Sequence, residues 1–188
     1  MNLRMPKGSK MVEEFRNKKT IIIGEVNTGK TNFLLNILKG FLKEGEKEIA
    51  LIDMAPESIK GIGGKIDDEN INTIKYYTAQ IVAPRLTGKT VEEVETFARH
   101  NAELIDEIFV EYLKSPTKVL FINDVSIYLQ AGDLNELLAL LHSTPTAIMN
   151  GYYGSSLGGG KLGERERENM KALQSRCDRV IKRVTTSP

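Results

Sequence analysis

Residues 24–31, with the sequence GEVNTGKT, join two segments whose apolar residues follow different periods. The segment before them, KTIIIG, is an unbroken apolar run ending in glycine, which predicts a β-strand buried on both faces. After Lys30 the apolar residues follow helical spacing and form one stripe, made of Phe33, Leu34, Ile37, Leu38 and Phe41. The chain must therefore pass from a buried strand into an amphipathic helix through one short loop, which restricts the fold more than any other feature.

This loop matches the pattern G-x-x-x-x-G-K-[ST], which is typical of a phosphate-binding site. Gly24 permits a sharp turn, Gly29 adopts angles that a side chain disfavours, and the backbone N–H groups would form an anion nest at a helix N-terminus. Lys30 would reach the β- and γ-phosphates of a nucleotide, and the Thr31 hydroxyl would bind Mg²⁺. The predicted nucleotide-binding residues are Gly24, Glu25, Val26, Asn27, Thr28, Gly29, Lys30, Thr31 and Asn32, with the Glu25 carboxylate turned away from the phosphates.

A phosphate site that uses Mg²⁺ also needs a carboxylate, which we expect at the carboxyl end of a strand beside the first one. Asp124 fits best, because it directly follows the apolar segment VLFIN. Asp53, which ends the apolar segment IALID, is the second candidate, since strand ends in a doubly wound sheet open onto one crevice. We therefore predict Thr31, Asp124 and Asp53 as metal ligands. The alternative for Asp124 is that it only caps the loop after its strand.

The group that would activate a water molecule is missing from its usual position. Many ATP hydrolases place a glutamate directly after the metal-binding aspartate, whereas this chain has Val125. Gln80, which follows a predicted strand, would orient a water without deprotonating it, and Glu57 is another substitute. The predicted catalytic residues are Lys30, Asp124 and Gln80.

Three further polar residues have two interpretations each. Asn150 ends a predicted strand and is either a sensor of the γ-phosphate or part of an Asn-Gly turn. Arg165 and Arg167 either stabilise charge on the phosphates or pair with neighbouring glutamates on a solvated helix face. The glycine-rich loop before them, residues 151–163, would close over an acceptor.

Predicted strands and helices alternate along the chain, which favours a three-layer α/β fold: a parallel sheet with helices on both faces. Further strands are predicted in IALID, TIKYYTAQ, KVLFIND, TAIMN and DRVIKRV. Thr90 and Glu93 have the spacing of a capping box, which predicts the start of a long helix that ends before Pro116. Residues 54–74 lack a steady period and predict a long loop, of the kind that is often functional.

The chain is long enough for one hydrophobic core, with 188 residues, of which 40% are apolar and 27% charged. We predict an N-terminal arm at residues 1–17 and a single nucleotide-binding domain at residues 18–188. The net charge of +1 gives no attraction to nucleic acid or membranes. Cys177 is the only cysteine, and no apolar run suits a signal peptide or a membrane span. These features predict a cytoplasmic protein.

With the glycine loop and Asp124 in place, the chain resembles the P-loop NTPases, which implies a RecA-like sheet. Its second half also resembles the ATP:corrinoid adenosyltransferases, in which a strand ends in Asp-Glu, a leucine-rich helix follows, and the next strand ends in Thr-Gly-Arg. Those places hold Asn123-Asp124, the helix after Gly132, and Asn150-Gly151-Tyr152 here. The chain departs from that family in three ways: its loop has Asn27-Thr28 in place of Gly-Lys, the acidic pair is displaced, and the arginine is missing.

Three functions follow as hypotheses. The first is an NTPase that uses Mg²⁺ and ATP or GTP, with the loop at residues 54–74 responding to the γ-phosphate; ATP is favoured because no guanine-reading Asn-Lys-x-Asp motif is present. The second is a transferase with an unknown second substrate, such as a small-molecule or polynucleotide kinase or a corrinoid adenosyltransferase, because the missing glutamate suits a site that excludes water attack. The third is a nucleotide-dependent switch with a protein partner, or a homo-oligomer subunit completed by a neighbour's arginine.

Overall fold

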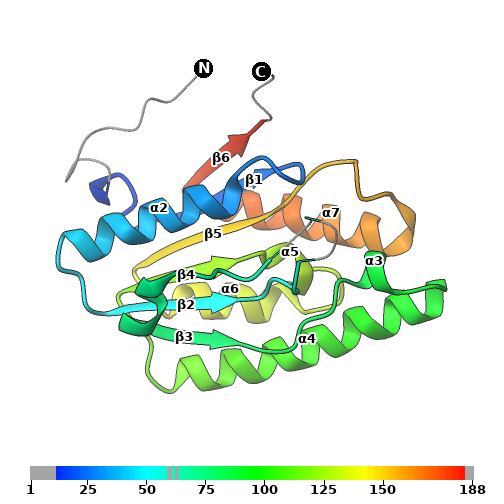
Figure 1. The fold of residues 1–188 in the computed structure, drawn as a ribbon, viewed down its shortest axis with the longest axis horizontal. Coiled ribbons are helices and arrows are strands. Elements are labelled where there is room, and N and C mark those ends of the chain that lie inside the picture. The colour runs from blue at the N-terminus through cyan, green and yellow to red at the C-terminus, as the bar shows by residue number, and fades with distance from the viewer. Residues whose placement is uncertain (1–11, 59–60, 62–63, 185–188) are drawn as a thin grey trace.

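A computed structural model describes residues 12–58, 61 and 64–184 (Figure 1). Six parallel strands in this part of the chain form one sheet with the order β3-β2-β4-β5-β1-β6. Each segment predicted to be a strand overlaps one of the six, although β5 extends two residues beyond the predicted TAIMN, and the α/β fold with a RecA-like parallel sheet is confirmed. The strands are β1 Lys19–Gly24, β2 Ile49–Asp53, β3 Lys75–Thr78, β4 Val119–Asn123, β5 Thr146–Tyr152 and β6 Arg179–Arg183.

The strand order corrects one expectation about the metal-binding carboxylate. We expected it to follow a strand beside β1, but β1 pairs with β5 and β6, and β4 lies one strand further away. Local sequence patterns specify where strands begin and end and contain little information on which strands are neighbours. All six strands are parallel, however, so the ends of β1, β5 and β4 still meet at one edge of the sheet.

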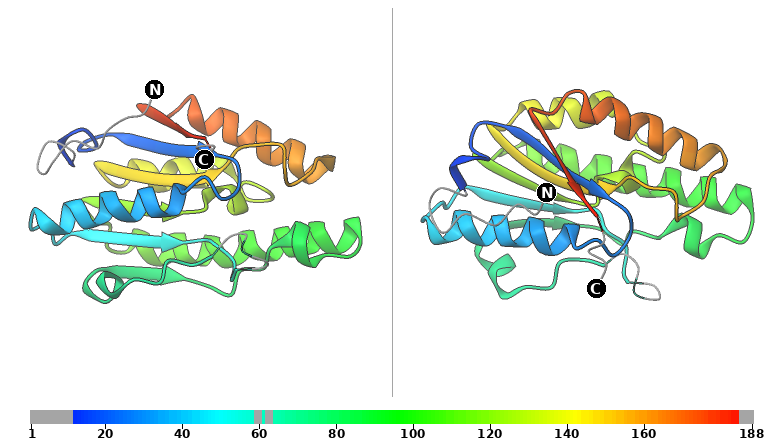
Figure 2. Two further views of the ribbon diagram at one scale, coloured as in Figure 1. Left: turned by 45° about the horizontal axis from the view of Figure 1, so that its top comes forward. Right: turned by 90° about the horizontal axis from the view of Figure 1, so that it is seen from above.

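Helices cover both faces of the sheet, as predicted (Figure 2). Helix α2, Lys30–Lys43, covers one face of the sheet. Its buried apolar stripe forms one hydrophobic cluster with Ile22, Leu51 and Ile148 of the sheet. The opposite face packs against buried residues of four helices. These are α4 Val91–Leu113, α5 Val125–Tyr128, α6 Leu134–His142 and α7 Gly160–Gln174. The result is a three-layer domain with the sheet in the middle.

The start of α4 agrees with the predicted cap, but its first apolar residue does not point inward. Thr90 Oγ1 accepts a hydrogen bond of 3.1 Å from the backbone N–H of Glu93. The Glu93 carboxylate reaches the backbone N–H of Lys89, one residue before the cap. Val91, which we assigned to the apolar face, is 79% exposed, whereas Ile105, in the same stripe, is fully buried. Two short helices, α3 Pro84–Thr87 and α5, were not predicted, because four residues are too few to show a period.

The described part of the predicted arm packs on the domain, with Val12 and Phe15 buried beside α2. Residues 1–11 of that arm lie outside the described residues, and the boundary at residue 17 stays a prediction. In the predicted loop 54–74, a 3-10 helix occupies Glu69–Thr73 and Ile66 is buried against the α2 face of the sheet. No helix in the described part of the chain is both long enough and apolar enough to cross a membrane.

Candidate functional site

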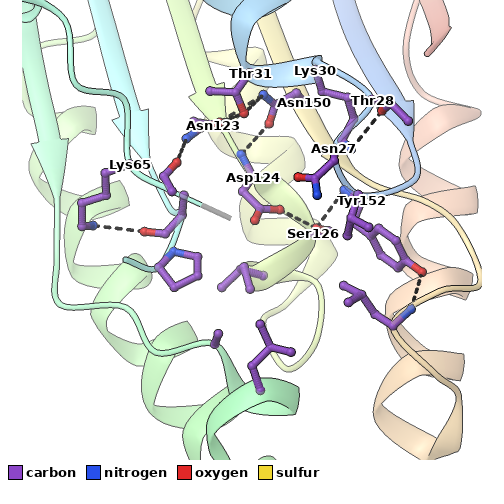
Figure 3. Close-up of a pocket in the computed structure, with 18 of the residues that line it drawn as sticks. Asn27, Thr28, Lys30, Thr31, Lys65, Asn123, Asp124, Ser126, Asn150 and Tyr152 are labelled. Atoms are coloured by element: carbon purple, nitrogen blue, oxygen red, sulfur yellow. Dashed lines mark hydrogen bonds between the residues drawn. The ribbon is translucent and has the colours of Figure 1, made fainter. Parts of the chain in front are cut away.

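A cavity of about 480 Å³ opens at the carboxyl ends of β1, β4 and β5 (Figure 3). The part that we call the loop half is lined by residues 26–32 and by Asn123, Asp124 and Asn150. The part that we call the distal half is lined by Ala83, Pro84, Arg85, Leu86, Ile127, Gln130, Tyr152 and Leu157. Most of the predicted nucleotide-binding residues therefore line one cavity, which also extends well beyond them.

The loop between β1 and α2 is held in a tight turn by its own contacts. A Cβ atom at Gly24 would overlap the carbonyl oxygen of Arg183 in the neighbouring strand β6, so only glycine fits there. Gly29 has φ 72° and ψ 23°, in the left-handed region that favours glycine. The Thr28 hydroxyl donates a hydrogen bond of 2.9 Å to the carbonyl oxygen of Glu25. Both glycines of the pattern are thus required by local geometry.

Lys30, the first residue of α2, directs its side chain back across the loop (Figure 3). Its Nζ donates a hydrogen bond to the carbonyl oxygen of Glu25 and lies 3.4 Å from the Thr28 hydroxyl. Burial lowers the pKa of the Lys30 ammonium, and the nearby Asp124 carboxylate opposes this shift. A partly desolvated cation at a helix N-terminus is well placed to attract an anion.

Glu25 points out of the loop half, as we expected from its position among phosphate-binding residues. Its carboxylate accepts hydrogen bonds from the backbone N–H and hydroxyl groups of Ser155 and Ser156. The hydroxyl of Ser156 and the backbone N–H of Ser155 together lower the pKa of Glu25 to about 2. A Cβ atom at Gly154 would overlap this carboxylate, so the glycine permits the contact. Glu25 therefore joins the β1–α2 loop to the loop before α7.

Asn150 and Asn123 connect the strand ends to the β1–α2 loop (Figure 3). Asn150 Oδ1 accepts a 2.7 Å hydrogen bond from the backbone N–H of Asp124, and its Nδ2 donates to Asn123 Oδ1 at 3.0 Å. The Thr31 hydroxyl also donates to Asn123 Oδ1, at 3.3 Å. The buried Asn150 amide therefore positions Asp124 directly and Thr31 through Asn123. The sequence singled out Asn150 but not the positioning role of Asn123, whose only signal is its place directly before Asp124.

Asp124 follows β4 and turns its carboxylate toward the cavity. Its backbone has φ 59° and ψ 54°, and the Ser126 hydroxyl donates a 2.6 Å hydrogen bond to Oδ1. Burial raises the pKa of Asp124, while Ser126 and the Lys30 ammonium oppose the rise. A hydroxyl and a carboxylate are the oxygen ligands that Mg²⁺ prefers. The described residues hold no group of three or more His, Cys, Asp or Glu side chains suited to a metal, so nucleotide and water oxygens would complete the coordination of Mg²⁺.

The Asp53 carboxylate does not line the cavity, and groups of the protein donate hydrogen bonds to it. It is fully buried and accepts hydrogen bonds from the backbone N–H groups of Ala55 and Ile66, from Asn123 Nδ2 and from the Tyr76 hydroxyl. Its closest link to the site is the 2.8 Å bond from Asn123. The structure thus separates the two predicted carboxylates, because Asp124 lines the cavity and Asp53 is buried and does not line it.

The predicted water-orienting residues also lie away from the cavity. Gln80 is exposed after β3, at the edge of the sheet and two strands from β4, and Glu57 is exposed in the loop after β2. Neither residue lines the cavity. The water-orienting role of Gln80 and Glu57 stays a prediction, and the geometry does not support it.

Arg165 and Arg167 make contacts outside the cavity, and these contacts are not the predicted pairs with neighbouring glutamates of the same helix. Arg165 donates to the carbonyl oxygen of Gln130 and forms a 2.8 Å ion pair with Glu95. Arg167 donates to the carbonyl oxygen of Gly154 at 2.6 Å. Neither guanidinium is therefore directed at the loop half.

Among the described residues, Arg85 in α3 is the arginine that lines the cavity. It forms a 2.5 Å ion pair with the buried Glu166 of α7, and its guanidinium lies over the Tyr152 ring at 5.6 Å. Glu166 Oε2 also accepts a 2.6 Å hydrogen bond from Gln130 Nε2. Burial raises the pKa of Glu166, and the Arg85 charge opposes the rise. Arg85 was not predicted as a cavity residue, although Pro84 at the first helical position is a usable signal for a short helix.

Comparison with solved structures supports the fold. The chain is similar to the flagellar accessory protein FlaH from Methanocaldococcus jannaschii, with a TM-score of 0.53 and 10% sequence identity, over 100% of this chain and 81% of that chain. At this identity the similarity shows the fold alone. No protein-family model matches the chain, and no curated protein matches it.

Proposed function

We propose that the chain binds ATP together with Mg²⁺ in the loop half and has NTPase activity. The observation that supports this most strongly is the meeting of Lys30, Thr31 and Asp124 at one cavity, beside a glycine loop at the start of α2. Backbone N–H groups of the loop and the Lys30 ammonium would hold the phosphates. The Thr31 hydroxyl and the Asp124 carboxylate would hold Mg²⁺, which supplies charge neutralisation at the β- and γ-phosphates.

The chain's own groups would keep these parts in place. Asn150 fixes the backbone of Asp124, and Asn123 Oδ1 receives the Thr31 hydroxyl, so both metal ligands are oriented by buried amides. Asp53 in turn holds the Nδ2 of Asn123. ATP rather than GTP is proposed because the sequence has no guanine-reading motif.

Transfer to a second substrate is the alternative function, and the cavity lining favours it over fast hydrolysis. Within the described residues, Asp124 is the only carboxylate that lines the cavity, and we assign it to the metal. Val125, which takes the place of the water-activating glutamate, is fully buried in the core. Slow hydrolysis would therefore accompany a faster reaction with an acceptor. A corrinoid acceptor, and the third hypothesis of a switch, stay predictions.

Calorimetry with ATP and Mg²⁺ tests the proposal, with Lys30→Ala as the decisive variant. Removing a cation that bonds to phosphate oxygens should weaken ATP binding by about 10- to 100-fold, which corresponds to about 1.5 to 3 kcal/mol. Lys43→Ala is the matched control, because Lys43 is an exposed lysine in the last turn of the same helix. Equal ATP affinity and equal phosphate release in Lys30→Ala and the unmodified protein would contradict the proposal.

A further inference from the structure

Glu25 belongs to the β1–α2 loop, yet its side chain holds a different segment of the chain. Its carboxylate accepts hydrogen bonds from the backbone N–H and hydroxyl groups of Ser155 and Ser156, two exposed residues after β5. We call residues 154–157 the strap. Among the described residues, these four donors make all the hydrogen bonds between the strap and the β1–α2 loop. The attachment of the strap to this loop therefore depends on one side chain.

The strap forms part of the cavity wall. Leu157 lines the cavity, and its backbone N–H donates a 3.0 Å hydrogen bond to the hydroxyl of Tyr152, which lines the cavity as well (Figure 3). Gly154, at the other end of the strap, accepts a 2.6 Å hydrogen bond from Arg167 of α7. Three consecutive glycines follow the strap at residues 158–160 and leave this part of the backbone with few restrictions. The strap is therefore a wall segment whose position is set by few contacts.

Lys30 connects the proposed phosphate site to the same residue. Its ammonium donates a hydrogen bond to the carbonyl oxygen of Glu25, which also accepts a 2.9 Å hydrogen bond from the Thr28 hydroxyl. In the proposed function this ammonium holds the phosphates of ATP. Glu25 therefore contacts the phosphate-binding lysine through its backbone and the strap through its carboxylate. A conformation of Glu25 that suits both contacts is favoured by a bound phosphate and by a closed strap alike.

We propose that Glu25 is a positioning residue through which polyphosphate binding in the β1–α2 loop and closure of the strap stabilise each other. The proposal rests on the proposed function, since the ligand is the phosphate chain of the nucleotide. Coupling between two sites is reciprocal: the factor by which the phosphate chain favours the closed strap equals the factor by which the closed strap raises the affinity for the phosphate chain. Nucleotide binding would thus also fix the wall that Leu157 contributes to the cavity.

The charge of Glu25 gives the proposal a sign that distinguishes it from simple electrostatics. The Ser156 hydroxyl and the Ser155 backbone N–H lower the pKa of Glu25 to about 2, so its carboxylate is charged at neutral pH. By charge alone this carboxylate repels phosphates, and Glu25→Ala should strengthen ATP binding. The proposal predicts weaker binding, because loss of the strap contact loosens the residue that Lys30 contacts. The sign of the change in affinity therefore separates the two explanations.

Amide hydrogen exchange of the full chain, measured by NMR, tests the coupling. Inorganic triphosphate and a non-hydrolysable ATP analogue, each with Mg²⁺, are the probes. Either probe should slow exchange of the Ser155 and Ser156 N–H groups at least about fivefold. Glu25→Ala should weaken binding of both probes, measured by calorimetry, by the same factor to within about twofold, and should abolish the effect of the probes on exchange.

Two further variants separate the strap contact from the charge. Gly154→Ala leaves the Glu25 charge in place, but its Cβ atom would overlap the carboxylate, so this variant should weaken binding as Glu25→Ala does. Glu164→Ala removes the same charge from an exposed position of α7, and it should change neither exchange nor affinity by more than about twofold.

The coupling is overturned by tighter or equal binding of the probes to Glu25→Ala, or by unchanged exchange of Ser155 and Ser156 when a probe is bound. It is also overturned by an unaltered affinity in Gly154→Ala, or by an equal loss of affinity in Glu164→Ala. These results leave the proposed function intact, because each is obtained with a bound probe. Absence of binding of both probes to the unmodified protein would instead contradict the proposed function and the coupling together.

Discussion

The carboxyl ends of β2 and β4 carry two aspartates that look alike in the sequence and differ in the structure. Asp53 directly follows four apolar residues of the buried strand β2, and Asp124 follows four apolar residues of the buried strand β4 with Asn123 between. Asp53 accepts hydrogen bonds from four donors of the protein and is fully buried. Asp124 accepts one side-chain hydrogen bond, from Ser126, and lines the cavity beside Lys30.

The difference follows from the residues around each strand end. After β2 the chain folds back so that Ala55 and Ile66 direct their backbone N–H groups at Asp53. After β4 the backbone takes left-handed angles at Asp124 and enters α5, which leaves one side of the carboxylate open to the cavity. The position at a strand end therefore identifies a candidate ligand, but the number of donors that surround the carboxylate decides whether it is available to a metal.

Asp124→Asn should have the largest effect of the variants that test this comparison. Loss of the only carboxylate at the metal position should lower Mg²⁺-dependent turnover of ATP at least about 100-fold. The free energy of unfolding should change by less than about 1 kcal/mol, because asparagine still accepts the Ser126 hydrogen bond and removes a buried charge. Turnover at several Mg²⁺ concentrations and urea unfolding measure the two effects. Unchanged Mg²⁺ dependence would remove Asp124 from the site.

Asp53→Asn should have a smaller effect on turnover and a larger effect on stability. Its amide would direct a donor toward one of four groups that now donate, which leaves a buried conflict and should cost about 2 to 4 kcal/mol of unfolding free energy. Turnover of the folded variant should fall by less than about tenfold, because Asp53 acts only through Asn123. A stable variant that no longer responds to Mg²⁺ would show that Asp53 is the ligand.

The sequence predicted the loop half of the cavity far better than the distal half. The loop half depends on residues 24–31, which are continuous in the chain and whose conformation follows from two glycines and the start of α2. The distal half brings together α3, α5 and residues 152–157, which are far apart in the chain. Their proximity depends on the order of the strands and on the buried Arg85–Glu166 pair, and no local pattern specifies either one.

The central claim is that Thr31 and Asp124 hold the metal, and locating the bound metal in a crystal tests it most directly. We expect crystals grown with a non-hydrolysable ATP analogue and Mn²⁺ to show an anomalous peak between the Thr31 hydroxyl and the Asp124 carboxylate, at distances of about 2.0 to 2.3 Å from its oxygen ligands. The phosphates should contact the N–H groups of residues 26–31 and the Lys30 ammonium. A peak at Asp53, or phosphates bound outside the β1–α2 loop, would contradict the account.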